Sequence, residues 1–141
     1  MRGAVAMSGN YGLMLNLMHQ DAERDRAVTE QIAFYQQHRQ LIQFGTFWRL
    51  VSPWQHPDFA AWMFVSPDKH EALVMAFSLV SLASAPLRLL HLAGLDAQAR
   101  YQIDDSPTEI GGDELMYRGI FIDPPLNRDY TSRIWHLRCS Q

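Results

Sequence analysis

The sequence predicts a mainly β chain, in which a C-terminal antiparallel β-sandwich follows one short strand and one long helix. Two patterns support this fold class. Residues 46–141 contain short runs rich in β-branched and aromatic residues, with turn residues about every ten positions between them, as in antiparallel sandwiches. Residues 22–43 instead repeat apolar side chains at helical spacing. The length of 141 residues, with 48% hydrophobic and 19% charged residues, is typical of one globular domain.

The strand and the helix are predicted in the first 45 residues. Residues 4–17, AVAMSGNYGLMLNL, predict a short buried strand, a Ser-Gly-Asn turn and a second apolar segment. The helix is predicted over residues 22–43, with Asp21 as its N-cap and Gly45 as its C-terminal stop. The apolar stripe on this helix consists of Val28, Ile32, Tyr35 and Ile42, widened by Phe34 and Leu41.

Seven strands are predicted after Gly45, because Pro, Gly, Asn and Asp clusters separate the apolar runs. Their ranges are 46–51, 60–66, 71–80, 87–92, 99–104, 117–122 and 131–138. The longest apolar run, ALVMAFSLVSLASAPL, is interrupted by serines and contains Pro86, and it is shorter than the roughly 20 residues of a membrane span. We therefore expect a buried strand there and no membrane partner.

A lone strand and one helix do not make a complete fold, because a single strand has no ladder partner. A strand followed by a long helix forms the last unit of a (β/α)8 barrel, whose full form takes about 250 residues. Residues 1–45 are therefore predicted to be the end of a truncated barrel, and residues 46–141 a C-terminal sandwich domain.

Charge and cysteine content restrict the partners and the compartment. The net charge of −3, with scattered Lys and Arg, gives no basic stripe and argues against nucleic acid and anionic membranes as partners. The single cysteine, Cys139, forms no internal disulfide, which fits a reducing compartment. The start of the sequence lacks an apolar stretch long enough for a signal peptide. We expect a cytoplasmic protein.

Five segments in order carry a resemblance to a known family: RGAVAMSGNYG, EQIAFYQQHRQLIQFGTFWRLVSP, AAWMFVSPDKHEALVMAF, GGDELM and SRIWHLR. Together they resemble the C-terminal part of bacterial family 36 glycoside hydrolases, the α-galactosidases that cleave melibiose and raffinose. The resemblance covers nearly the whole chain. It implies that this chain corresponds to the eighth strand and helix of a catalytic barrel, followed by a small C-terminal sandwich.

The resemblance also implies where the catalytic groups lie. Retaining glycosidases use two carboxyl groups about 5 Å apart, a nucleophile and an acid/base. In the family these are aspartates on middle strands of the barrel, which have no counterpart here, so we predict no catalytic residue and no activity for the isolated chain. The carboxylates in or beside one polar loop, which we expect to be structural, are Asp104, Asp105, Glu109, Asp113 and Glu114.

Ser8, Gly9 and Asn10 are the candidate substrate-binding residues. At the C-terminal end of a barrel strand, small residues let the backbone approach a sugar, so these residues would line the floor of the sugar pocket in the complete enzyme. A tight strand-to-loop turn explains them equally well. The family pattern often continues with a Tyr-Glu pair and an Asp, where this chain has Leu13, Met14 and Asn16.

Gly111, Gly112 and Asp113 are predicted to form a structural turn that leads into a strand. Two successive glycines indicate a positive φ or a close approach, and Asp113 is placed to accept hydrogen bonds from amides two residues on. The competing interpretation is a cation site made by the acidic residues of this loop, whose spacing lacks the alternation of a calcium loop.

The histidines and tryptophans give weaker indications. The six histidines show no metal-binding spacing and no carboxylate or cysteine partners in sequence, so we predict no metal site and no cofactor. Trp62 and Trp135 lie inside alternating runs and are expected in the core, whereas Trp54, in a loop flanked by prolines, is expected to be exposed. An aromatic platform for sugar is the alternative role of these tryptophans and of Trp48.

Two functions follow. The first is a C-terminal segment of an α-galactosidase, which closes and braces the barrel and carries no catalytic carboxylates; its partners are the rest of the barrel and an α-galactoside sugar. The second is a free-standing carbohydrate-binding or protein-interaction module. Under either function, a helix face that lacks its barrel neighbours favours self-association, so a homo-oligomer is possible.

Overall fold

A computed structural model of the chain describes residues 1–12, 22–82, 87–104, 106–122 and 128–140. Its largest element is a six-stranded antiparallel sheet with strand order β1-β2-β3-β8-β5-β6, and β4 pairs with β7 in a separate two-stranded sheet. The strands are β1 (Thr46–Val51), β2 (Phe59–Val65), β3 (Glu71–Ser78), β4 (Leu89–Leu90), β5 (Arg100–Ile103), β6 (Glu109–Gly111), β7 (Ile120–Phe121) and β8 (Thr131–Cys139). The predicted mainly β fold is confirmed.

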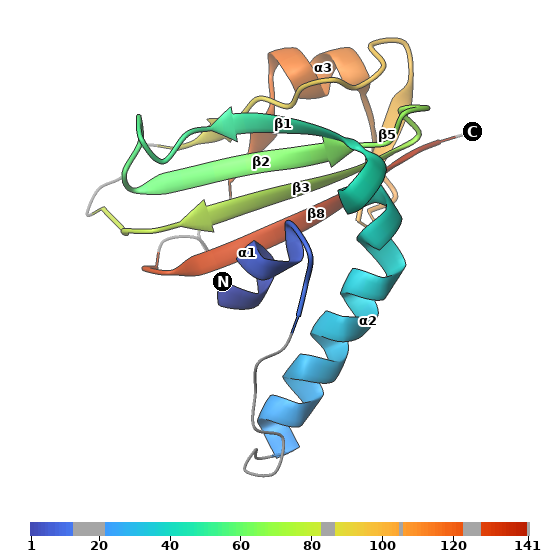
Figure 1. The fold of residues 1–141 in the computed structure, drawn as a ribbon. Helices are drawn as coiled ribbons and strands as arrows, with labels where there is room; N and C mark the ends of the chain where they lie inside the picture. Colours follow the sequence, from blue (N-terminus) through green and yellow to red (C-terminus); the bar gives the residue numbers. More distant parts are fainter. Residues whose placement is uncertain (13–21, 83–86, 105, 123–127, 141) are drawn as a thin grey trace.

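Helices cover both faces of the large sheet. α1 (Arg2–Met7) and α2 (Ala22–Phe44) lie on one side, and the short helix α3 (Gly112–Tyr117) lies on the other (Figure 1). No helix in the described part of the chain is long and apolar enough to cross a membrane.

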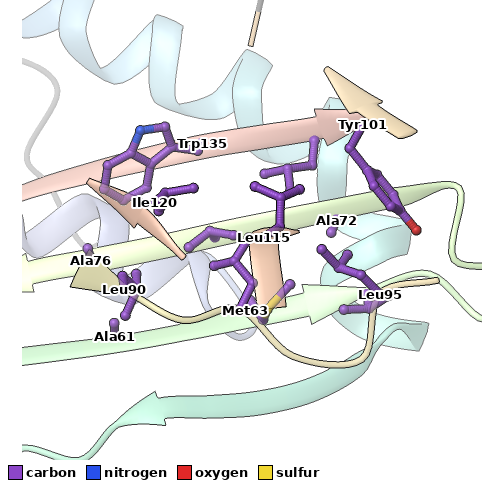
Figure 2. Packing of buried hydrophobic residues seen from close by; sticks show 14 of the residues in the cluster. Ala61, Met63, Ala72, Ala76, Leu90, Leu95, Tyr101, Leu115, Ile120 and Trp135 are labelled. Carbon is purple, nitrogen blue, oxygen red and sulfur yellow. The ribbon is translucent and has the colours of Figure 1, made fainter. Parts of the chain in front are cut away.

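The central strands are buried on both faces, and this explains their continuous apolar sequence. In β3, the side chains from Ala72 to Ser78 are all buried. One set of alternating residues, which includes Val74, packs toward β4, β7 and α3, and the other set, which includes Met75, packs toward α1 and α2. The first of these two cores contains Met63, Leu115 and Trp135 (Figure 2). The buried strand predicted from this run is confirmed.

Residues 2–7 form α1, so the strand predicted at the start of the chain is wrong. Among the described residues, no strand lies beside this segment to supply ladder hydrogen bonds, and a helical turn satisfies its backbone internally. The amide of Val5 donates to the carbonyl of Met1 over 3.0 Å, and that of Ser8 donates to the carbonyl of Val5 over 3.1 Å. The second predicted apolar segment falls mostly on residues 13–17, which lie outside the described residues.

The predicted long helix is confirmed as α2. Leu41 and Ile42 are buried against the sheet, and burying a side chain of this kind stabilises a fold by about 1.5–3 kcal/mol. The helix ends at Phe44, and Gly45 follows as predicted. A Cβ at Gly45 would clash with the carbonyl oxygens of Leu41 and Val65, so the close passage into β1 requires glycine. The predicted N-cap, Asp21, lies outside the described residues.

The segment EIGGDELMY differs from the prediction, because the two glycines lead into a helix rather than a strand. Residues 109–111 form β6, and Gly112 begins α3. Neither glycine has a positive φ. The second expectation, a close approach, is met at Gly112, where a Cβ would clash with the carbonyl oxygen of Asp96. Asp113 accepts a hydrogen bond from the amide of Glu114 over 2.8 Å, one residue on rather than two.

Candidate functional site

Ser8 lies at the C-terminal end of α1, where its hydroxyl joins the helix to the sheet. The hydroxyl accepts a hydrogen bond from Nε1 of Trp62 over 2.9 Å and lies 3.2 Å from the carbonyl oxygen of Ala4, to which it donates. It also lies 3.1 Å from Sδ of Met75. These contacts give Ser8 a structural role in the chain as described.

Gly9 and Asn10 continue from Ser8 toward α2. The carbonyl oxygen of Gly9 accepts a hydrogen bond from the hydroxyl of Tyr35 over 3.0 Å, and a Cβ at Gly9 would meet no atom of the described residues within 4 Å. Asn10 is exposed, and its side chain accepts from Nε2 of Gln43 over 3.5 Å. The positions where the chain departs from the family pattern, Leu13, Met14 and Asn16, lie outside the described residues.

A groove of about 430 Å³ opens beside α1 and brings two of the three predicted sugar-binding residues together with two tryptophans. Its lining comprises Val5, Ala6, Ser8, Gly9, Phe47, Arg49, Pro53, Trp54 and Trp62. Asn10 is not part of this lining. A concave surface with aromatic walls and a few polar groups is typical of sites for small molecules.

The tryptophans differ in exposure, as the sequence predicts for Trp135 and Trp54 but only in part for Trp62, which is expected in the core. Trp135 is 4% exposed and belongs to the core, and Trp54 is 90% exposed in the loop between β1 and β2. Trp62 is half-buried, stacks on Phe77 with ring centroids 4.3 Å apart, and presents its remaining surface to the groove. The groove therefore combines one fixed and one exposed indole.

The carboxylates of the polar loop have structural partners. Asp104 accepts a hydrogen bond from the amide of His136 over 2.9 Å, and Glu109 pairs with Arg100 at 3.3 Å. Glu114 pairs with Arg118 at 2.6 Å across one helical turn. Asp105 lies outside the described residues. The contacts of the other carboxylates join neighbouring strands and the ends of α3, in agreement with a structural role.

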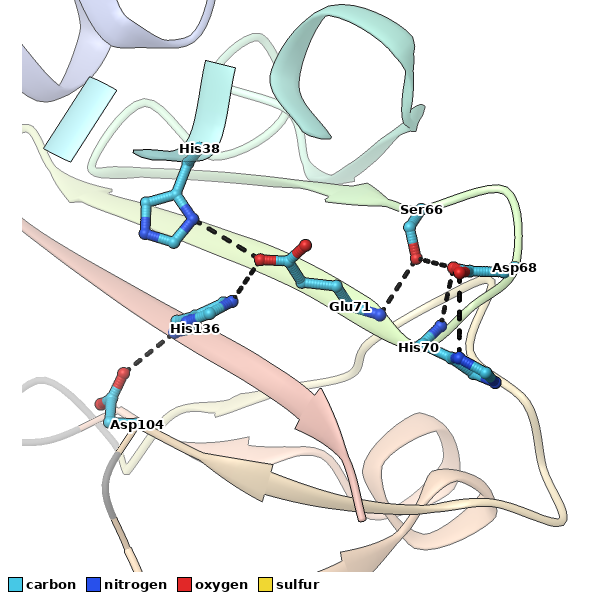
Figure 3. Close-up of polar contacts among 7 residues, drawn as sticks. All are labelled: His38, Ser66, Asp68, His70, Glu71, Asp104 and His136. Atoms are coloured by element: carbon cyan, nitrogen blue, oxygen red, sulfur yellow. Dashed lines mark hydrogen bonds and ion pairs between the residues drawn. The ribbon is translucent and has the colours of Figure 1, made fainter. Parts of the chain in front are cut away.

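One cluster was not foreseen, because its members come from a helix and two strands that are distant in sequence. His38 of α2, Glu71 of β3 and His136 of β8 converge (Figure 3). Nε2 of His136 lies 2.6 Å from Oε1 of Glu71, and Nδ1 of His38 lies 3.7 Å from the same oxygen. The expectation that no carboxylate gathers with the histidines is therefore wrong, since sequence spacing does not reveal contacts made across a sheet.

The electrostatics of this cluster depend on burial. Burial lowers the pKa of His38, and the neighbouring His136 lowers it further, whereas the nearby carboxylate of Glu71 raises it. His38 is 3% exposed, and its Nδ1 has no hydrogen-bond partner among the residues that the structure describes. The ring also packs against Phe34, with centroids 4.5 Å apart.

Comparison with protein families gives two matches that follow one another along the chain. Residues 1–45 match the melibiase family, and residues 59–137 match the glycosyl hydrolase family 36 C-terminal domain. The second match alone covers more than half of the 141 residues.

Individual relatives show the same similarity. The chain is 45% identical to alpha-galactosidase AgaA of Geobacillus stearothermophilus over 140 residues, and 44% identical to alpha-galactosidase 1 of Pediococcus pentosaceus over 137 residues. These alignments cover 99% and 97% of this chain, but only 19% and 18% of the relatives. A crystal structure of an AgaA variant in complex with raffinose superposes with a TM-score of 0.92 and 43% identity, over 99% of this chain and 19% of that one. The chain thus spans about a fifth of the length of the relatives that it matches.

Proposed function

Because the chain belongs to glycosyl hydrolase family 36, we propose that it is the C-terminal part of an α-galactosidase that hydrolyses terminal α-galactosides such as melibiose and raffinose. The observation that supports this most strongly is the alignment with AgaA, which runs through both the helical segment and the sheet at 45% identity. A free-standing carbohydrate-binding module is less favoured, because residues 1–45 match the melibiase family and not a separate binding domain.

In this function the chain supplies support rather than the catalytic pair. Hydrolysis with retention needs a nucleophile and an acid/base about 5 Å apart, and we place both in the remainder of the enzyme. No cofactor is required for that chemistry. Within this chain, the second core ties α1 and α2 to the sheet, so that the C-terminal domain holds the end of the barrel in position. The side chains of this core are Ala4, Met7, Leu41, Ile42, Ala60, Phe64, Leu73, Met75 and Phe77.

The exposed apolar side chains on the helical side fit a partner surface. Phe44, at the end of α2, is 75% exposed, and Val5 of α1 is 43% exposed. Removing apolar side chains of this size from water is favourable, so contact with the rest of the barrel would stabilise the complete enzyme. Without that contact, self-association of the chain is the expected result. We also propose a cytoplasmic location, from the cysteine content.

For substrate contact we propose Ser8, Gly9 and Asn10, with Gly9 as the position of closest approach. The free space around Gly9 supports this, because packing against the described residues does not require glycine there. The hydroxyl of Ser8 is already engaged by Trp62, so its part in sugar binding is to position the backbone that follows.

A chimera tests the proposed function. The segment of Geobacillus AgaA that matches this chain is replaced by the 141 residues, and release of nitrophenol from an aryl α-galactoside is measured. We expect the chimera to be active, and both the isolated chain and AgaA without the segment to be inactive. Two results would contradict the proposal. One is turnover by the isolated chain that follows the protein through purification. The other is a folded chimera that binds 1-deoxygalactonojirimycin, with which an AgaA variant forms a crystalline complex, no better than AgaA without the segment.

A further inference from the structure

Three side chains with metal-binding donor atoms meet where α2 crosses β3 and β8 (Figure 3). The donor atoms are Nδ1 of His38, Oε1 of Glu71 and Nε2 of His136, and all lie within 4.8 Å of one another. Because each residue belongs to a different element, the fold itself holds the three donors at this spacing.

The buried imidazole of His38 has a ring nitrogen whose hydrogen-bonding capacity no described residue satisfies. Its side chain is 3% exposed, and Nδ1 lies 3.7 Å from the carboxylate of Glu71, which is too long for a hydrogen bond. Buried polar atoms in folded proteins are almost always paired. The ring of His136 lies beside that of His38, with centroids 4.6 Å apart, and Glu71 lies on the Nδ1 side of His38 (Figure 3).

We propose that His38, Glu71 and His136 bind a divalent transition-metal ion, with Zn²⁺ as the ion that fits best. Zinc takes imidazole nitrogen at about 2.0–2.1 Å and carboxylate oxygen at about 2.0–2.2 Å in tetrahedral geometry, so neighbouring donors lie about 3.3 Å apart. The separation of 3.7 Å between His38 and Glu71 is close to this value. The contact of 2.6 Å between His136 and Glu71 is shorter than this value, so binding of the ion requires these two side chains to move apart.

Two of the three ligands are partly exposed, which gives the metal ion an entry path and leaves its fourth coordination position open to solvent. The Glu71 side chain is 41% exposed and that of His136 is 17% exposed, so an ion enters from the Glu71 side and retains a water molecule there. Two imidazoles and one carboxylate favour zinc over magnesium, which prefers oxygen ligands. Bound zinc would connect α2 to β3 and β8, and would therefore stabilise the attachment of the helix to the sheet.

Thermal unfolding of the 141-residue chain tests the site. After treatment with EDTA and removal of the chelator, ZnCl₂ or MgCl₂ is added and the midpoint is measured. We expect zinc at about a hundredfold excess over its dissociation constant to raise the midpoint by several degrees, and magnesium to leave it unchanged. A midpoint that zinc does not raise would overturn the proposal.

Matched variants locate the binding. Glu71→Gln and His136→Gln should each abolish most of the shift. His70→Gln should retain it, because the His70 side chain is 74% exposed and its Nδ1 lies 3.8 Å from the carboxylate of Asp68, outside the cluster. Cys139→Ser should also retain it, which excludes zinc capture by the free thiol. Retention of the full shift in Glu71→Gln and His136→Gln, or its loss in either control, would contradict the assignment.

Cobalt provides a measurement that does not depend on stability. Co²⁺ in a tetrahedral site with nitrogen and oxygen ligands absorbs strongly in the visible range, and we expect this spectrum for the unmodified chain and for His70→Gln, but not for folded Glu71→Gln. A spectrum of octahedral Co²⁺ in the unmodified chain would overturn the proposal. These experiments use no sugar and no catalytic partner, so their outcome is independent of the α-galactosidase function.

Discussion

The indole Nε1 of Trp62 donates a hydrogen bond to the hydroxyl of Ser8 over 2.9 Å, although the two residues are 54 positions apart. This bond joins the second strand of the sheet to the end of α1. It also fixes one wall of the groove, because both residues line it. The position of the predicted sugar-binding segment therefore depends on a side chain of the C-terminal sheet.

Trp62→Phe should loosen α1 without unfolding the sheet. Phenylalanine retains an aromatic face for Phe77 but loses the donor to Ser8, and a hydrogen bond of this kind contributes about 0.5–1.5 kcal/mol. Hydrogen exchange measured by mass spectrometry should accelerate in residues 2–9 and change little in β3. Trp54→Phe is the control, because Trp54 is 90% exposed. Equal exchange in residues 2–9 of all three proteins would refute the structural role of the bond.

Gly112→Ala should destabilise the chain more than Gly111→Ala. A Cβ at Gly112 would clash with the backbone carbonyl of Asp96, which cannot move without the chain. At Gly111 it would lie 2.5 Å from Oδ1 of Asp113, a side-chain atom that can rotate away at the cost of its hydrogen bond from the amide of Glu114. We expect a loss of roughly 1–3 kcal/mol for Gly112→Ala and a smaller loss for Gly111→Ala. Urea unfolding of the two variants measures the difference. Equal losses would show that the backbone of α3 shifts to accommodate the methyl group.

Much of this fold could be predicted from local pattern, and the exceptions have physical causes. Strands such as β3 and the helix α2 were found because periodicity and turn residues act over short distances. The sequence AVAM predicts a strand where α1 forms, because these residues suit either structure when a ladder partner is not known. α3 was missed because the Gly-Gly pair dominates its start, and a helix of six residues shows little periodicity.

The candidate site was predictable only in part, for a related reason. The sequence indicated Ser8 and Gly9 through the family resemblance, and Trp54 through its prolines, but not that they share one groove. The cluster of His38, Glu71 and His136 left no signal in sequence spacing, because pairing of β3 with β8 and docking of α2 bring its members together. Contacts between elements are set by the tertiary fold.

Gly9→Val should impair the action of the chimera on an α-galactoside while leaving the stability of the isolated chain almost unchanged. The space around Gly9 is open and its φ is not positive, so the midpoint of thermal unfolding of the isolated chain should change by no more than about two degrees. In the chimera with AgaA, the same change should reduce kcat/KM for an aryl α-galactoside at least about tenfold if the backbone approaches the sugar. Gly12→Val, at another glycine with open surroundings, is the control. Unchanged kinetics in Gly9→Val would remove Gly9 from the proposed site.

Tyr101 should make the chain sensitive to alkaline pH. Its side chain is fully buried, its hydroxyl donates to the carbonyl of Lys69 over 2.8 Å, and it accepts from the amide of Asp96 over 3.0 Å. Burial raises the pKa of Tyr101 above its usual value of 10.0, because the phenolate would lose its hydration. The folded chain therefore keeps a proton that the unfolded chain releases. This contribution to stability is fully present below about pH 10 and is lost as the pH rises toward the pKa of the folded state.

Urea unfolding between about pH 8 and pH 11 measures this effect, and the free energy of unfolding should fall by up to about 1.4 kcal/mol per pH unit above pH 10 from this group. Tyr101→Phe should lower stability by about 1 kcal/mol at neutral pH, since Lys69 and Asp96 lose their partner, yet should flatten the alkaline slope. Tyr130→Phe, at a tyrosine that is 70% exposed, is the control for loss of a phenol and should keep the slope of the unmodified chain. If the free energy of unfolding falls with pH at the same slope in Tyr101→Phe and Tyr130→Phe, the alkaline sensitivity comes from other groups.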